Sequence, residues 1–470
     1  MSGLVHSNHA GTNVLLFNPA GMHHQKDWLS IHIIGGDIFL GNDYMYLKKE
    51  EFKFSQIFSG NIPAHPIGVN NESRNFYIYD RNYNTRLDLD IKIQGPSAMF
   101  ILNEHAFALF SSFRSIQHIR NITPDLGRTQ YYGFAYTPQQ NQISELKNYN
   151  NSSLSWGEIG ISYAYQWNRL LYSNWNFGIS IKRLYGFAGY YSHTSSAKYN
   201  ILNDSTIDFL SYESELAFSM PIDYDTDQPT DSYINGTGWA FDIGVEYQRL
   251  LDRQSKSFGN QACSQPHFNY KYRIGVSLVD FGKINFNNNA QLHQYTNTSY
   301  TWVDIDTTHY NNWNQMVREI SNRFYGDPNA TYRASSFNMW LPASLNIDFD
   351  YNFENQIYLN TSLVYNFPIN GNYMQKPSII SIAPRFEAKD LEVNLTASLY
   401  QWRYPRVGLS LRLYFLTIGS DYLTSMFGWH DFNGTDFYFS IKFNIGKGSC
   451  TKRNKFGPCG EVHRNFPWSD

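Results

Sequence analysis

The sequence predicts an all-β protein that crosses a membrane as an antiparallel β-barrel of about 14 strands (roughly 12 to 16). Its composition is the first observation, because 17% of the 470 residues are aromatic and only 16% are charged, which favours strands over long helices. The second is that no run approaches the roughly 18 to 20 consecutive apolar residues that a spanning helix needs. The third is a repeated alternation of apolar and polar residues, which is typical of barrel strands.

The alternation has a period of two residues, which places successive side chains on opposite faces of a sheet. Between Leu87 and Ile93 every second residue is Leu or Ile, and the residues between them are Asp88, Asp90 and Lys92. The same strong pattern predicts strands at 239–248, 270–278, 344–351, 391–399 and 437–445. A looser form of the pattern predicts strands at 28–46, 105–113, 159–165, 175–181, 357–365, 378–386 and 407–413.

The predicted connections between the strands alternate in length. Asn103-Glu104 and Lys389-Asp390 read as tight turns on one side of the barrel. Long polar loops are expected on the other side at 48–85, 114–153, 187–236 and 282–336. Within the last of these, residues 311–324 have apolar side chains near helical spacing and predict a short helix that packs on its own loop.

Aromatic residues near the predicted strand ends suit the lipid headgroup layer, where amphipathic rings are common. The alternative is that they form the core of a soluble β-protein. These residues are Trp340, Tyr351, Tyr365, Tyr400 and Trp402.

We divide the chain into an N-terminal hatch or plug segment (1–27), a barrel (28–446) and a C-terminal tail (447–470). The first 14 residues lack the basic segment and the apolar core of a secretory signal, so a signal was removed or the protein is not exported. Cys450 and Cys459 in the tail would close a small ring in an oxidising compartment, and the alternative is two unpaired thiols.

Two sets of residues resemble known families. The stretch from His6 to Gly21, which precedes the strand that begins at Trp28, resembles the N-terminus of barrels related to the long-chain fatty-acid transporter family. The chain as a whole more closely resembles a Bacteroidota outer-membrane family of unassigned function, which is distantly similar to the barrel proteins that accompany type IX secretion. The segments that carry this second resemblance are Gln94-Gly-Pro-Ser97, Arg273-Ile-Gly-Val-Ser-Leu-Val-Asp280-Phe-Gly282, Trp340-Leu-Pro342 and Ile418-Gly-Ser-Asp421.

The first resemblance implies that Asn18, Pro19, Ala20 and Gly21 are the motif of a hatch in or near the lumen. The residues themselves predict a turn before the first strand, because Pro19 biases Asn18 toward an extended backbone and Gly21 tolerates positive φ. An ordinary N-terminal turn is the alternative to a hatch. The second resemblance implies no activity, because that family has none assigned and one barrel architecture hosts unrelated functions.

Charged residues on the polar faces of the strands are expected to line the lumen. Burial there would require them to pair across it, which predicts a polar plug or constriction. Carboxylates on the same strand, such as Asp88 with Asp90, decorate one lumen face and do not flank a bond as a glycosidase pair must. The candidate lumen charges are Asp88, Asp90, Asp242, Lys271, Arg273, Asp348, Asp350, Arg406 and Arg412.

The sequence offers no foothold for catalysis, because it contains no nucleophile elbow, zincin motif, P-loop or dinucleotide fingerprint. We therefore predict neither an enzyme nor a cofactor. The N-terminal histidines His6, His9, His23, His24 and His32 match no known metal spacing. A weak calcium candidate consists of Asp223, Asp225, Asp227 and Asp231. It lacks the Gly and the closing Glu of an EF-hand, and the alternative is a solvated acidic loop.

The balance of 37 basic and 40 acidic residues gives no basic surface for nucleic acid. The nominal function is passive transport of a small hydrophobic or amphipathic solute across the outer membrane, with lipid and that solute as partners. The first alternative is a scaffold barrel that holds other outer-membrane or secretion proteins. The second is a soluble β-rich carbohydrate-binding protein.

Overall fold

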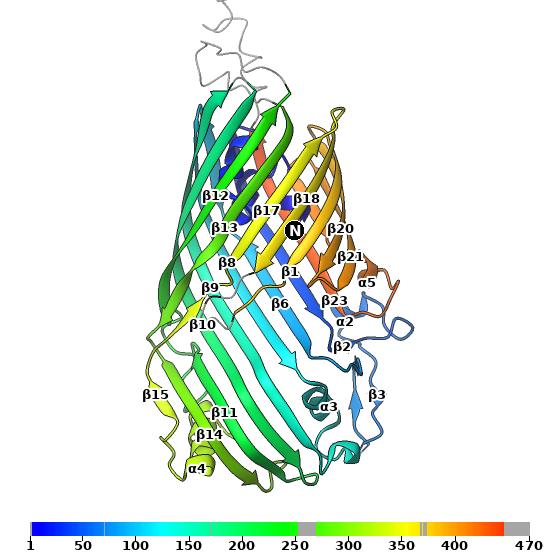
Figure 1. The fold of residues 1–470 in the computed structure, drawn as a ribbon, viewed down its shortest axis with the longest axis vertical. Coiled ribbons are helices and arrows are strands. Elements are labelled where there is room, and N and C mark those ends of the chain that lie inside the picture. Colours follow the sequence, from blue (N-terminus) through cyan, green and yellow to red (C-terminus); the bar gives the residue numbers. More distant parts are fainter. Residues whose placement is uncertain are drawn as a thin grey trace, which may run out of the picture.

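The computed structural model describes residues 2–69, 71–170, 172–251, 269–366, 369 and 374–445. Fourteen strands form a closed antiparallel barrel, which confirms the predicted fold class (Figure 1). The ring closes where the first strand pairs with the last, for example Gly36 with Phe439.

Two of the 14 positions in the barrel wall are each shared by two short strands, β6 with β7 and β16 with β17. In order, the barrel strands are β1 (Leu29–Asn42), β6 (Thr85–Gln94) with β7 (Ser97–Leu102), β8 (His105–Ile122), β9 (Ile143–Leu170), β10 (Ser173–Ile201), β12 (Gly236–Leu250), β13 (Tyr270–Phe286), β16 (Phe337–Trp340) with β17 (Ser344–Asn352), β18 (Ile357–Asn366), β19 (Ile379–Glu387), β20 (Leu391–Tyr400), β21 (Tyr404–Leu413), β22 (Leu416–Ser420) and β23 (Gly434–Ile445).

Every strand predicted from the alternation is present. Asn103-Glu104 and Lys389-Asp390 are the turns between β7 and β8 and between β19 and β20, and we call this end of the barrel the turn end. β22 has no counterpart among the predicted strands, because its five residues are too few to show a period.

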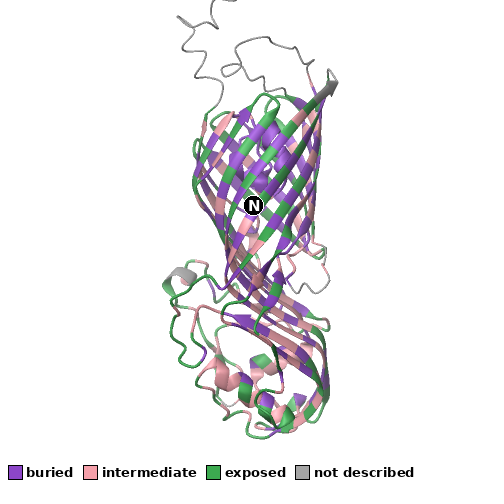
Figure 2. Ribbon diagram, turned by 90° about the vertical axis from the view of Figure 1, so that its left-hand side faces the viewer, coloured by how far each residue is buried: buried purple, intermediate pink, exposed green. Residues whose placement is uncertain are grey.

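The barrel has an apolar outside and a polar inside. Along β9, Ile159 and Ile161 are 53% and 60% exposed, whereas the polar residues on either side of them, Glu158 and Ser162, are buried. Figure 2 shows this alternation of exposed and buried residues around the barrel. An apolar outer surface around a polar interior is the arrangement of a barrel that spans a membrane, and it argues against the soluble carbohydrate-binding alternative.

In the described part of the chain, no helix is both long and apolar enough to cross a membrane.

Three of the four expected long loops are wrong. β8, β9 and β10 continue far beyond the barrel, and further strands pair with them to form a sheet that we call the extension (Figure 1). The strands of the extension that the barrel lacks are β11 (Ile207–Ser219), β14 (Ala290–Trp302) and β15 (Tyr332–Ala334). These segments read as loops because serine, asparagine and tyrosine occupy both faces of the sheet and weaken the alternation.

The helix predicted at 311–324 is confirmed as α4 (Trp313–Tyr325), with Asn312 as its N-cap. α4 packs its Val317 against Phe218 of the extension. Only short elements occur in the fourth expected loop, 48–85, and in the other connections on the same side of the barrel. They are β2 (Met45–Tyr46), α2 (Gln56–Ser59), β3 (His65–Pro66), β4 (Ser73–Arg74), β5 (Tyr77–Ile78), α3 (Pro124–Tyr132), η3 (Thr137–Gln139) and α5 (Leu423–Met426).

Tyr400 was expected in the lipid headgroup layer, and this is wrong. Its side chain points into the barrel and is 2% exposed, because it lies on the same face of β20 as the buried Glu392 and Asn394. Tyr365 and Trp402 are 44% and 51% exposed. Trp340 and Tyr351 are half-buried.

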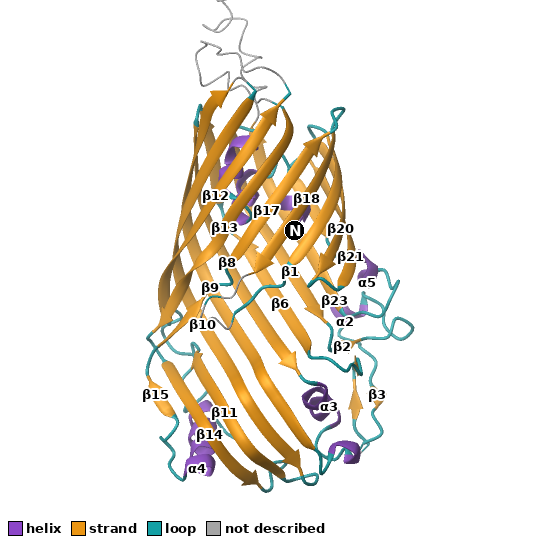
Figure 3. Cartoon of the chain, in the orientation of Figure 1, coloured by secondary structure: helices purple, strands orange, loops and turns teal. Residues whose placement is uncertain are grey.

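The N-terminal segment lies inside the barrel near the turn end (Figure 3). It consists of α1 (Ser2–Val5), η1 (Gly11–Leu16) and η2 (Pro19–His24). We call residues 2–27 the hatch segment. At the opposite end of the lumen, where β10 exchanges its partner β12 for β11, an apolar cluster that includes Trp156, Phe286 and Met374 fills the interior.

Candidate functional site

The tip of the hatch segment lies on a floor of glycines. Gly178 of β10 pairs with Gly244 of β12, and both face the lumen beneath Asn18 and Pro19. A Cβ atom at Gly178 would lie 2.3 Å from the backbone nitrogen of Ala20, and one at Gly244 would lie 1.9 Å from Asn18 Oδ1. Only glycine therefore leaves room for the hatch tip against this wall.

The sequence motif has a local explanation at each position. Asn18 is extended (φ −153°), as Pro19 predicts, and its Oδ1 accepts a hydrogen bond of 2.9 Å from the Ala20 nitrogen. Pro19 then begins a 3-10 helix where a turn was expected, since its fixed φ suits a first helical position. Gly21 does not have a positive φ. Its hydrogen permits close packing, because a Cβ there would lie 2.6 Å from Val14 Cγ2.

Polar contacts hold the hatch segment in the lumen. The carbonyl oxygen of His6 accepts hydrogen bonds from Arg273 (3.1 Å) and Arg385 (2.8 Å). The Nζ atom of Lys26 lies 2.6 Å from Glu387 Oε1. Lys442 of the last strand donates a 3.0 Å bond to the carbonyl of Ala10. The segment is thus bound by reversible polar interactions with strands on several sides of the barrel.

Arg273, Asp348 and Asp350, three of the predicted lumen charges, lie together beneath the hatch segment. Arg273 is 3.0 Å from Asp350 Oδ2, 3.8 Å from Asp348 Oδ2 and 3.2 Å from Glu246 Oε2. All of these side chains are at least 97% buried. The predicted lumen charges therefore contact the hatch segment, and their action as a plug or constriction stays a prediction.

A second charge cluster lies on the wall formed by β8 to β13. The predicted lumen residue Asp242 is 2.7 Å from the Nζ atom of Lys182, which also lies 2.8 Å from Asp280. Asp280 in turn accepts a 2.9 Å bond from Arg114. The guanidinium group of Arg114 lies 4.6 Å from the ring centre of Trp156.

The other predicted lumen charges are separate from these clusters. Asp88 pairs with His118 at 2.6 Å and also accepts a hydrogen bond from Tyr400. Arg406 stacks on the ring of Tyr400. Three more occupy different places. Asp90 is half-buried in the lumen. Arg412 lies 3.1 Å from Glu392. Lys271 is at the barrel rim, 3.1 Å from Glu354.

Several charged residues of these clusters were not predicted as site residues. They occupy polar positions in the alternation of their strands, so the alternation could have placed them in the lumen. These residues are Arg385, Glu387, Lys182, Asp280 and Arg114. What the pattern does not show is which charges meet, because partners such as Arg114 and Asp280 are far apart in the sequence.

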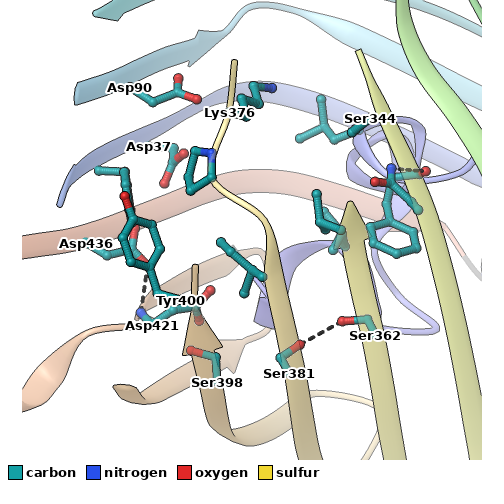
Figure 4. Close-up of a pocket in the computed structure, with 18 of the residues that line it drawn as sticks. Asp37, Asp90, Ser344, Ser362, Lys376, Ser381, Ser398, Tyr400, Asp421 and Asp436 are labelled. Atoms are coloured by element: carbon teal, nitrogen blue, oxygen red, sulfur yellow. Dashed lines mark hydrogen bonds between the residues drawn. The ribbon is translucent and has the colours of Figure 1, made fainter. Parts of the chain in front are cut away.

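A cavity of about 210 Å³ lies between the hatch segment and residues 374–378, which enter the lumen just before β19 and which we call the strap. Val5, Leu16 and Phe17 of the hatch segment form an apolar part of its lining, and Lys376 and Pro377 of the strap form another part. Aspartates on β1 and β23 line the acidic side, which Figure 4 shows. The cavity thus combines an apolar and a charged surface.

The barrel wall is interrupted beside this region. Gly95 and Pro96 separate β6 from β7, and Pro96 has no N–H group to donate to the ladder. A hollow of about 480 Å³ opens on the wall there, lined by Gly95, Phe113, Phe187 and Ile234 among others, and it reaches the buried Glu158. The wall is therefore hollowed between β6, β8 and β9.

The remaining candidate sites show no arrangement for a metal. Among the described residues, no three His, Cys, Asp or Glu side chains are placed to hold an ion. Asp223 Oδ1 accepts hydrogen bonds from the backbone nitrogens of Asp225 and Thr226, as in an ordinary acidic turn. Cys450 and Cys459 lie outside the described residues.

The structure was compared with solved structures. The chain is 10% identical to a TodX deletion mutant, a monoaromatic hydrocarbon channel, with a TM-score of 0.43 and 93% and 95% of the two chains covered. The chain is 11% identical to the toluene transporter TodX of Pseudomonas putida, with a TM-score of 0.39 and 94% of each chain covered. It is 9% identical to a FadL homologue of Pseudomonas aeruginosa, with a TM-score of 0.30 and with 94% of this chain and 96% of that chain covered.

Sequence comparisons give one family. No curated protein matches the chain significantly. The expected links to Bacteroidota and to type IX secretion stay predictions. A model of a protein family of unknown function, DUF5723, matches residues 35–421. Because this match spans well over half of the 470 residues, the protein belongs to the DUF5723 family.

Proposed function

We propose that this protein is an outer-membrane β-barrel that passively transports a small hydrophobic or amphipathic solute. The observation that carries the proposal is the cavity of about 210 Å³ between the hatch segment and the strap. Its apolar and charged surfaces suit a molecule with both kinds of group. Short turns of such barrels face the periplasm, so in this proposal the hatch segment is periplasmic and the extension faces outward.

The hatch segment is the gate in this proposal. It rests on the glycine floor without a covalent link to it, and its contacts with Arg273, Arg385 and Glu387 are polar and exchangeable. The break between β6 and β7 at Gly95 and Pro96 is a second route in this proposal, because the hollow on the wall there is lined by the buried Glu158 as well as by apolar residues. An apolar solute would leave sideways there, into lipid.

The test compares three proteins in lipid bilayers. Gly178→Val would push the hatch tip off its floor, since a Cβ there would lie 2.3 Å from Ala20. We expect low conductance from the wild type, a larger conductance from Gly178→Val, and wild-type behaviour from the outward-facing Thr361→Val control on β18.

A second measurement tests the cavity directly. Ser398→Phe would fill it from β20, and Thr361→Phe adds the same side chain to the outer face. We expect native mass spectrometry to find a small amphipathic molecule on the wild type and on Thr361→Phe but not on Ser398→Phe. A wild type without ligand, together with unchanged conductance in Gly178→Val, would overturn the proposal.

The extension favours one second candidate, a scaffold that holds protein partners. It places a large sheet and the helices α3 and α4 beyond the barrel, where surface for a partner is available. A ligand-free and electrically silent barrel that binds defined proteins through the extension would support this candidate over transport.

A further inference from the structure

We infer that the cavity selects an amphipathic organic cation, whose ammonium or guanidinium head group binds Asp37 and whose apolar part lies against the hatch segment. The inference rests on the proposed function, because it names the class of solute for the same cavity. It goes beyond a general preference for small amphipathic molecules by assigning the charge of the head group.

Asp37 is the residue that points to a cation. Its side chain is on β1, faces the cavity and is 6% exposed. Its Oδ1 atom has no hydrogen-bond partner within the part of the chain that the structure describes. A carboxylate that is removed from water without a partner costs free energy, and a bound cation would recover that cost.

Other carboxylates lie on the same side of the cavity. Figure 4 shows Asp37, Asp90, Asp421 and Asp436 there, on or beside four elements of the wall. Asp90 Oδ1 also lacks a hydrogen-bond partner among the described residues. Asp436 Oδ2, in contrast, accepts a 2.8 Å bond from the backbone nitrogen of Asp421. Among the described residues, Asp37 Oδ1 and Asp90 Oδ1 are thus two acceptors on this side without a hydrogen-bond donor.

The basic residues around the cavity are directed elsewhere. The Nζ atom of Lys376 lies 3.5 Å from Asp280, in the second charge cluster. The guanidinium group of Arg406 lies 3.9 Å from the ring centre of Tyr400 and 4.1 Å from that of Tyr422. These two cations are therefore not directed at Asp37.

Lys92 is the one basic residue placed opposite Asp37. The two residues are directly paired in the ladder between β1 and β6, where opposite charges usually interact. Their side chains nevertheless form no ion pair in the structure, and Lys92 lines the same cavity. A ligand cation would thus compete with Lys92 for Asp37. Replacing Lys92 therefore tests the inference.

The apolar part of the ligand has a defined surface to contact. Val5, Leu16 and Phe17 of the hatch segment and Val364 and Ile379 of the wall line the cavity. Phe17 also packs in the apolar cluster that joins α1 to β23. A cation with a short apolar tail would therefore touch the gate itself when it binds Asp37.

The test is calorimetric titration of the full chain in lipid nanodiscs with three probes of similar size, namely phenethylammonium, 2-phenylethanol and 3-phenylpropionate. We expect the cation to bind roughly tenfold or more tightly than the alcohol, because a charge-assisted hydrogen bond is gained, and the anion to bind least. Asp37→Asn should remove the advantage of the cation and leave the alcohol unaffected. Lys92→Met should increase the affinity for the cation.

Controls separate this inference from the proposed function. Asp436→Asn tests the acidic side if Asp37→Asn does not fold, and Asp204→Asn in an exposed turn of the extension should change nothing. If all three probes bind equally and Ser398→Phe abolishes their binding, the inference is overturned while the transport cavity stands. If no probe binds, both the inference and the proposed function are overturned.

Discussion

Arg385 shows at the scale of one residue how the lumen is held together. Its guanidinium group lies 3.1 Å from Asp350 and 3.1 Å from Glu387, and it also donates to the carbonyl of His6. Its side chain is fully buried. Removing this cation would leave two buried carboxylates short of a partner and the hatch segment short of a donor.

We expect Arg385→Met to lower the free energy of unfolding by about 3 to 5 kcal/mol, the usual cost of breaking a buried ion pair from one side. The free energy is measured by denaturant titration in detergent micelles, followed by tryptophan fluorescence. Lys271→Met is the matched control, because its rim pair with Glu354 is solvated and its loss should not be measurable. Equal effects of the two variants would refute the role given to Arg385.

The sequence predicted which residues face inward better than it predicted their partners. Asp348, Asp350 and Arg273 were placed in the lumen by the alternation alone, because a period of two fixes the face of every residue on a strand. The glycine floor was not predictable in this way. A glycine inside a strand shows no pattern of its own, and only the hatch tip above Gly178 and Gly244 explains why no side chain fits there.

At the scale of the element, the extension continues β8, β9 and β10 beyond the barrel, and His293 makes its stability depend on pH. His293 lies on β14, is 3% exposed, and hydrogen-bonds Thr331 and Gln291. Burial lowers its pKa from 6.5 to about 4. The unfolded extension therefore takes up a proton before the folded one, so stability is full above pH 6.5 and is lost as the pH falls toward 4.

We expect the denaturant midpoint of the extension to fall over this window more steeply in the wild type than in His293→Gln, which keeps hydrogen-bonding groups but does not titrate. The midpoints are measured by near-ultraviolet circular dichroism at several pH values. His309→Gln, in an exposed loop of the extension, is the control and should follow the wild type. Parallel curves for the wild type and His293→Gln would show that His293 is not responsible.

The elements of the barrel were more predictable than those of the extension. Barrel strands contact lipid on one face, so their alternation is strong, as at Leu87 to Ile93. In the extension, water is available near both faces, and strands such as β11 carry polar residues on each side. α4 was predictable because its apolar stripe packs on that sheet and keeps a helical period.

At the scale of the whole molecule, the limit of the membrane along the barrel is testable on a single strand. Ile161 and Ile143 both lie on β9 and are 60% and 68% exposed, but Ile161 is on the barrel and Ile143 is at the far end of the extension. An arginine that faces lipid near the bilayer midplane costs about 2 to 4 kcal/mol, whereas one in water costs little.

We therefore expect Ile161→Arg to reduce the stability of the barrel in lipid vesicles by about that amount, and Ile143→Arg to leave it unchanged. Folding yield and unfolding in urea, followed by the gel mobility of the folded form, measure the difference. A barrel that tolerated both substitutions equally would not be surrounded by lipid at Ile161.

The architecture as a whole followed from composition and period, while the cavity did not. A closed barrel is the only way to pair every strand edge, so strand count and alternation already imply it. The cavity depends on where the hatch segment and the strap end inside that barrel. Both are short segments without a repeating pattern, and their positions are fixed by contacts such as Arg120 with Gln375 that no local rule predicts.

The position of the hatch segment has a consequence for the order of assembly. The barrel closes only when β1 meets β23, strands from opposite ends of the chain, so the seam is among the slowest contacts to form. The hatch segment directly precedes β1 and is therefore tethered at this seam. In the closed barrel, Lys442 of β23 donates a hydrogen bond to the carbonyl oxygen of Ala10. A chain that closed around an empty lumen would leave this buried ammonium group without the Ala10 acceptor, so the N-terminal segment stabilises the seam that encloses it.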